Sequence, residues 1–288
     1  MGLKNLDKLT EYINYRNQAF ESKLVDGVKN PLGNNHFCNN QKYLDAFSQD
    51  IIHSNTVLEQ ENASTEEILY NTLVHRVLLD KDFCKEHTDE NGVFRLKDYD
   101  QLVKETDNAP KWSSRYRNML QNRFLAKMKT SEFFSKIIDT TLPLLNEFHD
   151  CNQSDIWNSS NLDKGYQIGG FTKYQLSSDL LYIDRLNIKP DIIDYNRLGT
   201  QRGMHEITGH WDYDNDVIMT IMDINNNYDH KTEYTKHMIP SDANNVLCEF
   251  YKYTVSNKVR RRKPEIITHK KNDVIIPKSI KEFNYNDL

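Results

Sequence analysis

The sequence predicts a mainly α-helical, all-α fold, and three observations lead to this prediction. Apolar side chains recur along most of the chain at the three- and four-residue spacing of amphipathic helices. The 288 residues include only 10 Gly and 7 Pro, so few positions break such helices. One short segment alone, residues 273–277 (DVIIP), has the pattern of a strand.

The first half of the chain contains three expected helices. Residues 3–20 place Leu6, Leu9 and Ile13 near one stripe, and residues 41–52 repeat this spacing. Residues 64–78 start with Ser64 and two glutamates, which suit the positive end of a helix dipole. We therefore expect helices over these three ranges.

The second half continues the helical pattern. Residues 113–128 and 131–148 are expected helices, and Pro143 should kink or restart the latter. Further helices are expected at residues 171–186, 214–225 and 242–255. We predict one helical domain over residues 1–265 and a C-terminal tail over residues 266–288.

Charge is distributed unevenly, although the net charge is only −5. Residues 111–129 carry six cations and no anion, residues 258–263 (KVRRRK) carry five cations, and residues 203–230 carry six acids and no Lys or Arg. Such polarity favours one basic face for a polyanion, while the alternative is two ordinary solvated segments. The phosphate-binding candidates in these segments are Arg115, Arg117, Arg260, Arg261 and Arg262.

The sequence predicts neither a metal nor a cofactor. The four cysteines form no C-x-x-C pair, and residues 205–210 (HEITGH) exceed the zinc-protease spacing by one residue. Acidic residues 212–223 imitate a calcium loop, but Val217 stands where that loop needs Gly. No phosphate-binding G-x-x-x-x-G-K-[ST] stretch is present.

The chain has no apolar run of about 18 residues and no apolar N-terminal signal region. We therefore expect a cytoplasmic protein without a membrane-spanning helix.

Five segments, in order, carry a family resemblance. They are residues 12–20 with 30–31, 37–45 (FCNNQKYLD) and 48–51; residues 67–79; residues 165–181 (GYQIGGFTKYQLSSDLL); residues 198–204 (LGTQRGM); and residues 247–253 (LCEFYKY). Together they resemble the α-glutamyl/putrescinyl-thymine pyrophosphorylase family, also described as the helical domain of hydroxymethyl-deoxyuridine DNA kinases. The resemblance covers roughly residues 10 to 265.

This resemblance implies a helical fold similar to helix-hairpin-helix DNA glycosylases, acting on hypermodified bases in DNA. The same fold family includes an anti-phage DNA glycosylase that excises α-glucosyl-hydroxymethylcytosine, and the chain is similar to it. The leading hypothesis is a monofunctional DNA glycosylase that flips out and excises such a base and leaves an abasic site. The partner would be DNA with modified pyrimidines, and we expect a monomer.

Two alternatives stay open. One is a transferase that replaces an activating group on hydroxymethyl-uracil in DNA with an amine or amino acid, because some family members are described in this way. The other is a non-catalytic reader of modified DNA.

The hairpin candidates for DNA phosphate binding are Gly169, Gly170, Thr172 and Lys173. A short glycine turn lets backbone N–H groups meet a phosphate at the positive N-terminal end of the next helix. An ordinary loop is the alternative for the glycines. For Lys173, phosphate contact or surface charge is favoured over a Schiff base.

Asp179 is the first candidate for catalysis. It lies nine residues after Gly170 and matches the family's Asp-Leu motif. A carboxylate there would stabilise a sugar cation and orient water at C1′. Asp194 is the rival, and a capping or salt-bridged Asp179 is the structural alternative.

A second constellation comprises Asn39, Lys42 and Asp45. If a helix begins at Gln41, Lys42 and Asp45 share a face and Asn39 lies at its boundary. Asn39 would read a base edge, and Asp45 would be a second acid or bind a base substituent. The alternative is a helix-capping Asn beside an intrahelical ion pair.

Three further residues are candidates for binding the base or substrate. Glu249 and Lys252 are three apart on an expected helix, where an ion pair is the simplest interpretation. Their match to the family suggests that they line or brace the site. Arg202 would hold a phosphate or a charged substituent.

Overall fold

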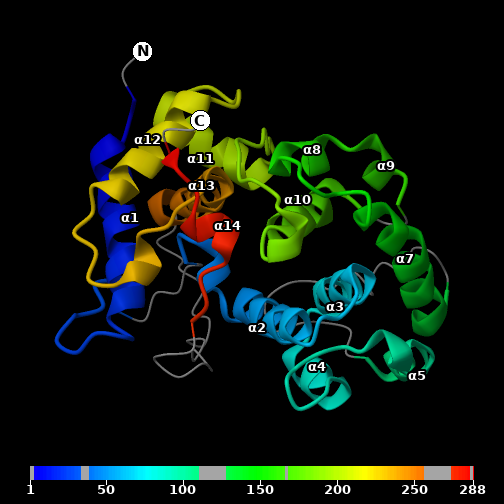
Figure 1. Ribbon diagram of the computed structural model, residues 1–288. Coiled ribbons are helices and arrows are strands. Elements are labelled where there is room, and N and C mark those ends of the chain that lie inside the picture. Colours follow the sequence, from blue (N-terminus) through cyan, green and yellow to red (C-terminus); the bar gives the residue numbers. More distant parts are fainter. Residues whose placement is uncertain (1–2, 34–38, 110–127, 166–167, 256–273, 286–287) are drawn as a thin grey trace. The chain divides into compact units, whose positions relative to one another are not determined.

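The computed structural model describes residues 3–33, 39–109, 128–165, 168–255, 274–285 and 288, which form a mainly helical structure without strands (Figure 1). By its internal contacts the chain divides into two compact units. Unit 1 comprises Met1–Ala46, Pro190–Ile276 and Ile280–Leu288, and unit 2 comprises Phe47–Lys189 and Pro277–Ser279. The all-α prediction is confirmed for the described residues.

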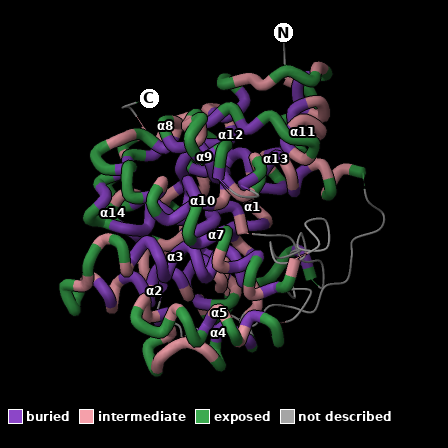
Figure 2. The backbone as a smooth tube through the Cα atoms, turned by 90° about the vertical axis from the view of Figure 1, so that its right-hand side faces the viewer, coloured by how far each residue is buried: buried purple, intermediate pink, exposed green. Residues whose placement is uncertain are grey.

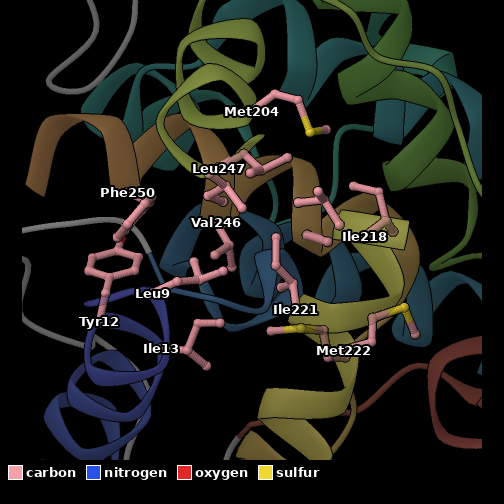
Figure 3. Close-up of a cluster of buried hydrophobic side chains, with 14 residues drawn as sticks. Leu9, Tyr12, Ile13, Met204, Ile218, Ile221, Met222, Val246, Leu247 and Phe250 are labelled. Atoms are coloured by element: carbon pink, nitrogen blue, oxygen red, sulfur yellow. The ribbon is translucent and has the colours of Figure 1, made fainter. Parts of the chain in front are cut away.

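Unit 1 is built around an apolar core between its main helices. These are α1 (Leu6–Glu21), α11 (Leu198–Thr208), α12 (Asn215–Asn226) and α13 (Pro240–Val255). Leu9 and Ile13 of α1, Ile221 of α12 and Phe250 of α13 are fully buried in one cluster (Figure 3). The stripe predicted for residues 3–20 therefore faces this core, except that Leu6 is exposed.

Helices α11 and α13 approach each other closely along a glycine-lined face. A Cβ atom on Gly203 would lie 2.1 Å from the backbone O of Leu247, and one on Gly199 would lie 2.5 Å from Cys248 Sγ. The two glycines are four residues apart and so share one helix face. Residues 198–204 and 247–253, which carry the family resemblance, are thus held together by a contact that needs small residues.

Unit 2 is organised around α3 (Thr65–Leu78), in which every residue from Ile68 to Leu78 is buried (Figure 2). It packs against α7 (Thr130–Leu145) and α10 (Gly170–Leu180), and α10 packs against α8 (Gln153–Asn158). The other helices of this unit are α2 (Ala46–Gln60), α4 (Lys81–His87), α5 (Tyr99–Glu105) and α9 (Ser160–Asp163).

Short helical turns and a C-terminal helix connect these elements. Among the described residues, the 3-10 helices are η1 (Lys42–Leu44), η2 (Leu96–Asp98), η3 (Thr106–Asn108), η5 (Asp184–Leu186) and η6 (Glu233–Thr235). Helix α14 spans Lys278–Lys281.

The helices predicted at residues 3–20, 64–78, 131–148, 214–225 and 242–255 are confirmed as α1, α3, α7, α12 and α13. Ser64 caps α3, since its side chain accepts the Glu67 N–H at 3.1 Å. The helix does not restart at Pro143, because α7 continues to Leu145, and the kink expected there stays a prediction. A proline this close to the end costs the helix little.

Three other predictions differ from the structure. The prediction of a strand at residues 273–277 is wrong for residues 274–277, which have no regular secondary structure and pair with no strand among the described residues. The helix expected from residue 41 begins only at Ala46, after η1. The helix expected over residues 171–186 ends at Leu180 and is followed by η5.

Some expectations fall on residues that the structure does not describe. The helix at residues 113–128 lies almost wholly there, and so does the predicted domain boundary after residue 265. That boundary therefore stays a prediction. Within the described ranges, no helix combines the length and apolar character needed to cross a membrane.

Candidate functional site

The segment that carries Asn39 and Asp45 is anchored to unit 1 by buried amide side chains. Asn40 Nδ2 donates to Ile13 O at 2.9 Å and to Asn17 Oδ1 at 3.0 Å. Gln41 Nε2 donates to Thr235 O at 2.7 Å. Both amide side chains are at most 3% exposed, so the turn that follows them has a fixed place between α1 and η6.

Asn39 holds the Asp45 carboxylate. Its Nδ2 donates to Asp45 Oδ1 and to Leu44 O, both at 3.0 Å, while its Oδ1 accepts from Arg16 Nη2 at 3.3 Å. Both amide protons of Asn39 are therefore used inside the protein. This geometry supports an orienting role for Asn39 toward Asp45, and its reading of a base edge stays a prediction.

Asp45 and Asn39 are more accessible than Arg16. Arg16 is only 6% exposed, whereas Asn39 and Asp45 are half-buried. The arrangement Arg16–Asn39–Asp45 therefore places an oriented carboxylate where water or a ligand can reach it. Catalytic carboxylates are often oriented in this way, by a hydrogen-bonded side chain that a further side chain holds in place.

Asp242 also belongs to this cluster, although its sequence position did not predict such a role. Its carboxylate accepts the Lys42 N–H at 2.7 Å and the Ile239 N–H at 3.1 Å, and it is 2% exposed. The Lys42 side chain, a predicted substrate-binding group, is itself buried. A local signal for Asp242 existed, since it lies in the first turn of α13, but such a position alone indicates only a helix cap.

Asp179 lies in unit 2 and is bound by Arg76. Arg76 Nε donates to Asp179 Oδ2 at 2.6 Å and Nη2 donates to Oδ1 at 2.7 Å. The side chains are 6% and 0% exposed, respectively. Phe47 lies beside the pair, with the guanidinium carbon 5.5 Å from its ring centroid. Asp179 therefore presents no surface to a ligand in this structure.

The hairpin residues are only partly available for phosphate. Gly169 is the exposed N-cap of α10, and Thr172 is half-buried in its first turn. Lys173 is 5% exposed, and its Nζ donates to Asp163 Oδ1 at 2.6 Å. The backbone of Gly169 and Gly170 thus fits the expected role better than Lys173, whose charge is already paired.

The remaining candidates lie on unit 1. The Arg202 guanidinium lies 5.1 Å from the Tyr251 ring centroid, joining α11 to α13. Glu249 accepts from Lys252, so the expected ion pair is present. Asp194 is exposed in the segment before α11.

Five predicted phosphate-binding residues lie outside the described part of the chain: Arg115, Arg117, Arg260, Arg261 and Arg262. Within the described part, no three His, Cys, Asp or Glu side chains form a group that could hold a metal ion.

Comparison with known families adds the class of protein. Residues 4–263 match the family model described as 5-hmdU DNA kinase, helical domain. This match covers most of the 288 residues, so the chain belongs to that family, which is linked to modification of bases in phage DNA. No match to the chain was found among curated proteins or among solved structures. The family resemblance inferred from the five segments is confirmed.

Proposed function

We propose that this chain is a DNA glycosylase that flips out and excises a bulky hypermodified pyrimidine, such as α-glucosyl-hydroxymethylcytosine in phage DNA. The observation that carries the proposal is the half-buried Asp45, whose carboxylate is held by Asn39, which Arg16 holds in turn. Membership of a DNA base-modification family supplies the substrate class.

Excision of a base requires the nucleotide to leave the helix stack, because its glycosidic bond is otherwise hidden. As the bond between C1′ and the base nitrogen breaks, its electron pair leaves with the base and positive charge develops on the sugar. Asp45 stabilises that charge and orients a water molecule, whose oxygen bonds to C1′. The water gives up a proton to the Asp45 carboxylate as it bonds to C1′, the departing base nitrogen takes up a proton, and an abasic site remains in the strand.

Asn39 serves this reaction as a positioning residue. A carboxylate that is free to rotate must be ordered before it can face the sugar, and this ordering reduces the rate. The bonds from Asn39 to Asp45 and from Arg16 to Asn39 establish that order before substrate binds. In this proposal the buried Asp179 is the structural partner of Arg76, and the exposed Asp194 has no assigned part in the chemistry.

The DNA backbone would meet the exposed glycine turn before α10 and the cationic segments that contain Arg115, Arg117 and residues 260–262. Backbone N–H groups at a helix N-terminus bind phosphate without sequence preference. We place this activity in the cytoplasm, in a monomeric protein that acts in defence against phage.

The test is incubation of the purified chain with DNA containing glucosylated hydroxymethylcytosine and with unmodified DNA. Free base in the supernatant and alkali-labile breaks in the modified DNA alone would support excision. Asp45→Asn should lower the rate at which both products form by about 100-fold or more, while the matched variant Asp194→Asn should retain them. Intact strands without free base would contradict the proposal. A heavier nucleoside after addition of an amine donor to DNA with activated hydroxymethyl-uracil would instead indicate the transferase.

A further inference from the structure

The Asp242 carboxylate joins two segments that are 200 residues apart in the sequence. One of its oxygens accepts the Lys42 N–H at the start of η1, and the other accepts the Ile239 N–H immediately before α13. It is 2% exposed, so these two N–H groups replace water as its partners. Asp242 thus fixes the start of η1 to the start of α13.

The same turn determines where Asp45 lies. The Asp45 N–H donates to Lys42 O at 3.0 Å, and the Leu44 N–H donates to Gln41 O at 3.2 Å. Asn39 then binds both Leu44 O and Asp45 Oδ1. The backbone of Lys42 thus bonds to both residues, to Asp242 through its N–H and to the Asp45 N–H through its carbonyl. A movement of the Asp242 carboxylate would therefore move Lys42 and, with it, Asp45.

We propose that Asp242 is a positioning residue for Asp45: its carboxylate fixes the Lys42–Leu44 turn so that Asp45 faces the substrate. This inference rests on the proposed function for its catalytic consequence. The fixed turn itself is a property of the fold that can be measured without any substrate.

The proposal predicts a pH dependence. Burial raises the pKa of Asp242 to about 7, helped by the charge of Asp45 and opposed by the N–H groups of Lys42 and Ile239 and by the charge of Lys42. Burial, together with the Asp242 charge, in turn raises the pKa of the adjacent Tyr43 hydroxyl. Above this pH both Asp242 oxygens accept N–H groups; below it, the oxygen that takes the proton becomes a poorer acceptor. The turn should therefore loosen as the pH falls through about 7.

A helix cap is the simpler role for Asp242, and unit 2 offers a matched control. Asp155 in α8 accepts the Asn152 N–H at 2.8 Å in a capping box, but it is exposed and belongs to unit 2, whereas η1 belongs to unit 1. Asp155→Asn therefore removes a helix-capping carboxylate without changing the turn at Lys42. Loss of the buried Asp242 carboxylate changes exchange at Lys42 in either role, but only a positioning role predicts that folded Asp242→Asn has a lower kcat than folded Asp155→Asn.

The experiment measures hydrogen exchange of the Lys42 amide and the steady-state kinetics of base release from DNA that carries one modified nucleotide. Asp242→Asn should accelerate exchange of the Lys42 amide at least about tenfold, since a hydrogen bond to a buried charge is lost. The kcat of Asp242→Asn at pH 8 should be lower than that of the wild type, with little change in KM. The kcat of the wild type should fall below pH 7, whereas that of the variant should not. Asp155→Asn should match the wild type in all three measurements.

Unchanged exchange at Lys42 in Asp242→Asn would overturn the proposal, as would an unchanged kcat at pH 8. If Asp242→Asn does not fold, the test uses the wild type. The protection factor of its Lys42 amide against hydrogen exchange should decrease as the pH falls through 7. A constant protection would refute the proposal. Absence of base release by the wild type would refute the glycosylase, while the exchange data would still test the fixed turn.

Discussion

The buried pair Arg76–Asp179 gives the clearest prediction about which carboxylate performs the chemistry. Asp179→Asn leaves the guanidinium in place but removes the charge that neutralises it. The two hydrogen bonds measure 2.6 and 2.7 Å, and the side chains are 6% and 0% exposed. Loss of one member of such a buried pair costs about 3–5 kcal/mol. We therefore expect a large loss of stability.

The assay is urea denaturation of the wild type and Asp179→Asn, with base release measured at a temperature where the variant remains folded. Asp229→Asn, which removes the partner of Lys231 from an exposed pair, is the control and should leave the denaturation midpoint unchanged. Folded Asp179→Asn should still release base, because Asp45 performs the reaction. The double variant Arg76→Met, Asp179→Leu should regain much of the lost stability.

The result that would refute this reasoning is an Asp179→Asn variant as stable as the wild type but inactive. Such a protein would identify Asp179 as the group that contacts substrate. It would also remove Asp45 from the centre of the mechanism.

Two further predictions concern close packing and burial. Gly203→Ala should lower the free energy of unfolding measured in urea by about 1–3 kcal/mol, because the new Cβ would lie 2.1 Å from Leu247 O. The control Gly169→Ala should lower it by less than about 1 kcal/mol, because no atom lies within 4 Å of its new Cβ. Equal effects of the two substitutions would contradict the close contact between α11 and α13. Burial lowers the pKa of His75 from 6.5 to about 4, and its Nε2 bonds to Gly92 O at 3.1 Å. The stability of the wild type relative to His75→Gln should therefore fall by about 3 kcal/mol between pH 7 and pH 4, and a constant difference would contradict a neutral, buried imidazole.

The helices that the sequence predicted well are those with local signals. Ser64 and the glutamates after it mark the start of α3, and the Ser64 cap is present. Helix α11 was missed because Gly199 and Gly203 weaken its local pattern, although they serve a close approach to α13. Helices α4, α5, α8 and α9 were missed as well, and each has at most seven residues.

The turn before Asp45 could not be predicted, because distant contacts determine it. Gln41 bonds to Thr235 O, and Lys42 bonds to Asp242, each about 200 residues along the chain. These bonds replace the helix expected from residue 41. The sequence therefore identified Asn39 and Asp45 as a pair but not the geometry that joins them.

The partner of Asp179 was hidden for the same reason. Arg76 lies 103 residues earlier in the chain and belongs to another predicted segment. A sequence shows which side chains carry charge, but pairing between distant segments depends on the fold. A buried carboxylate and an accessible one thus look alike until the helices that carry them are placed.

The most direct test of the central claim is the single-turnover rate of base release from saturating modified DNA by the wild type and by Asp45→Asn. The affinity of both proteins for the DNA is measured in parallel, to ensure that the same fraction of each protein is bound to DNA. The account predicts a fall of about 100-fold or more in the rate with nearly unchanged affinity. Base release by Asp45→Asn at the wild-type rate would contradict the claim that this carboxylate performs the excision.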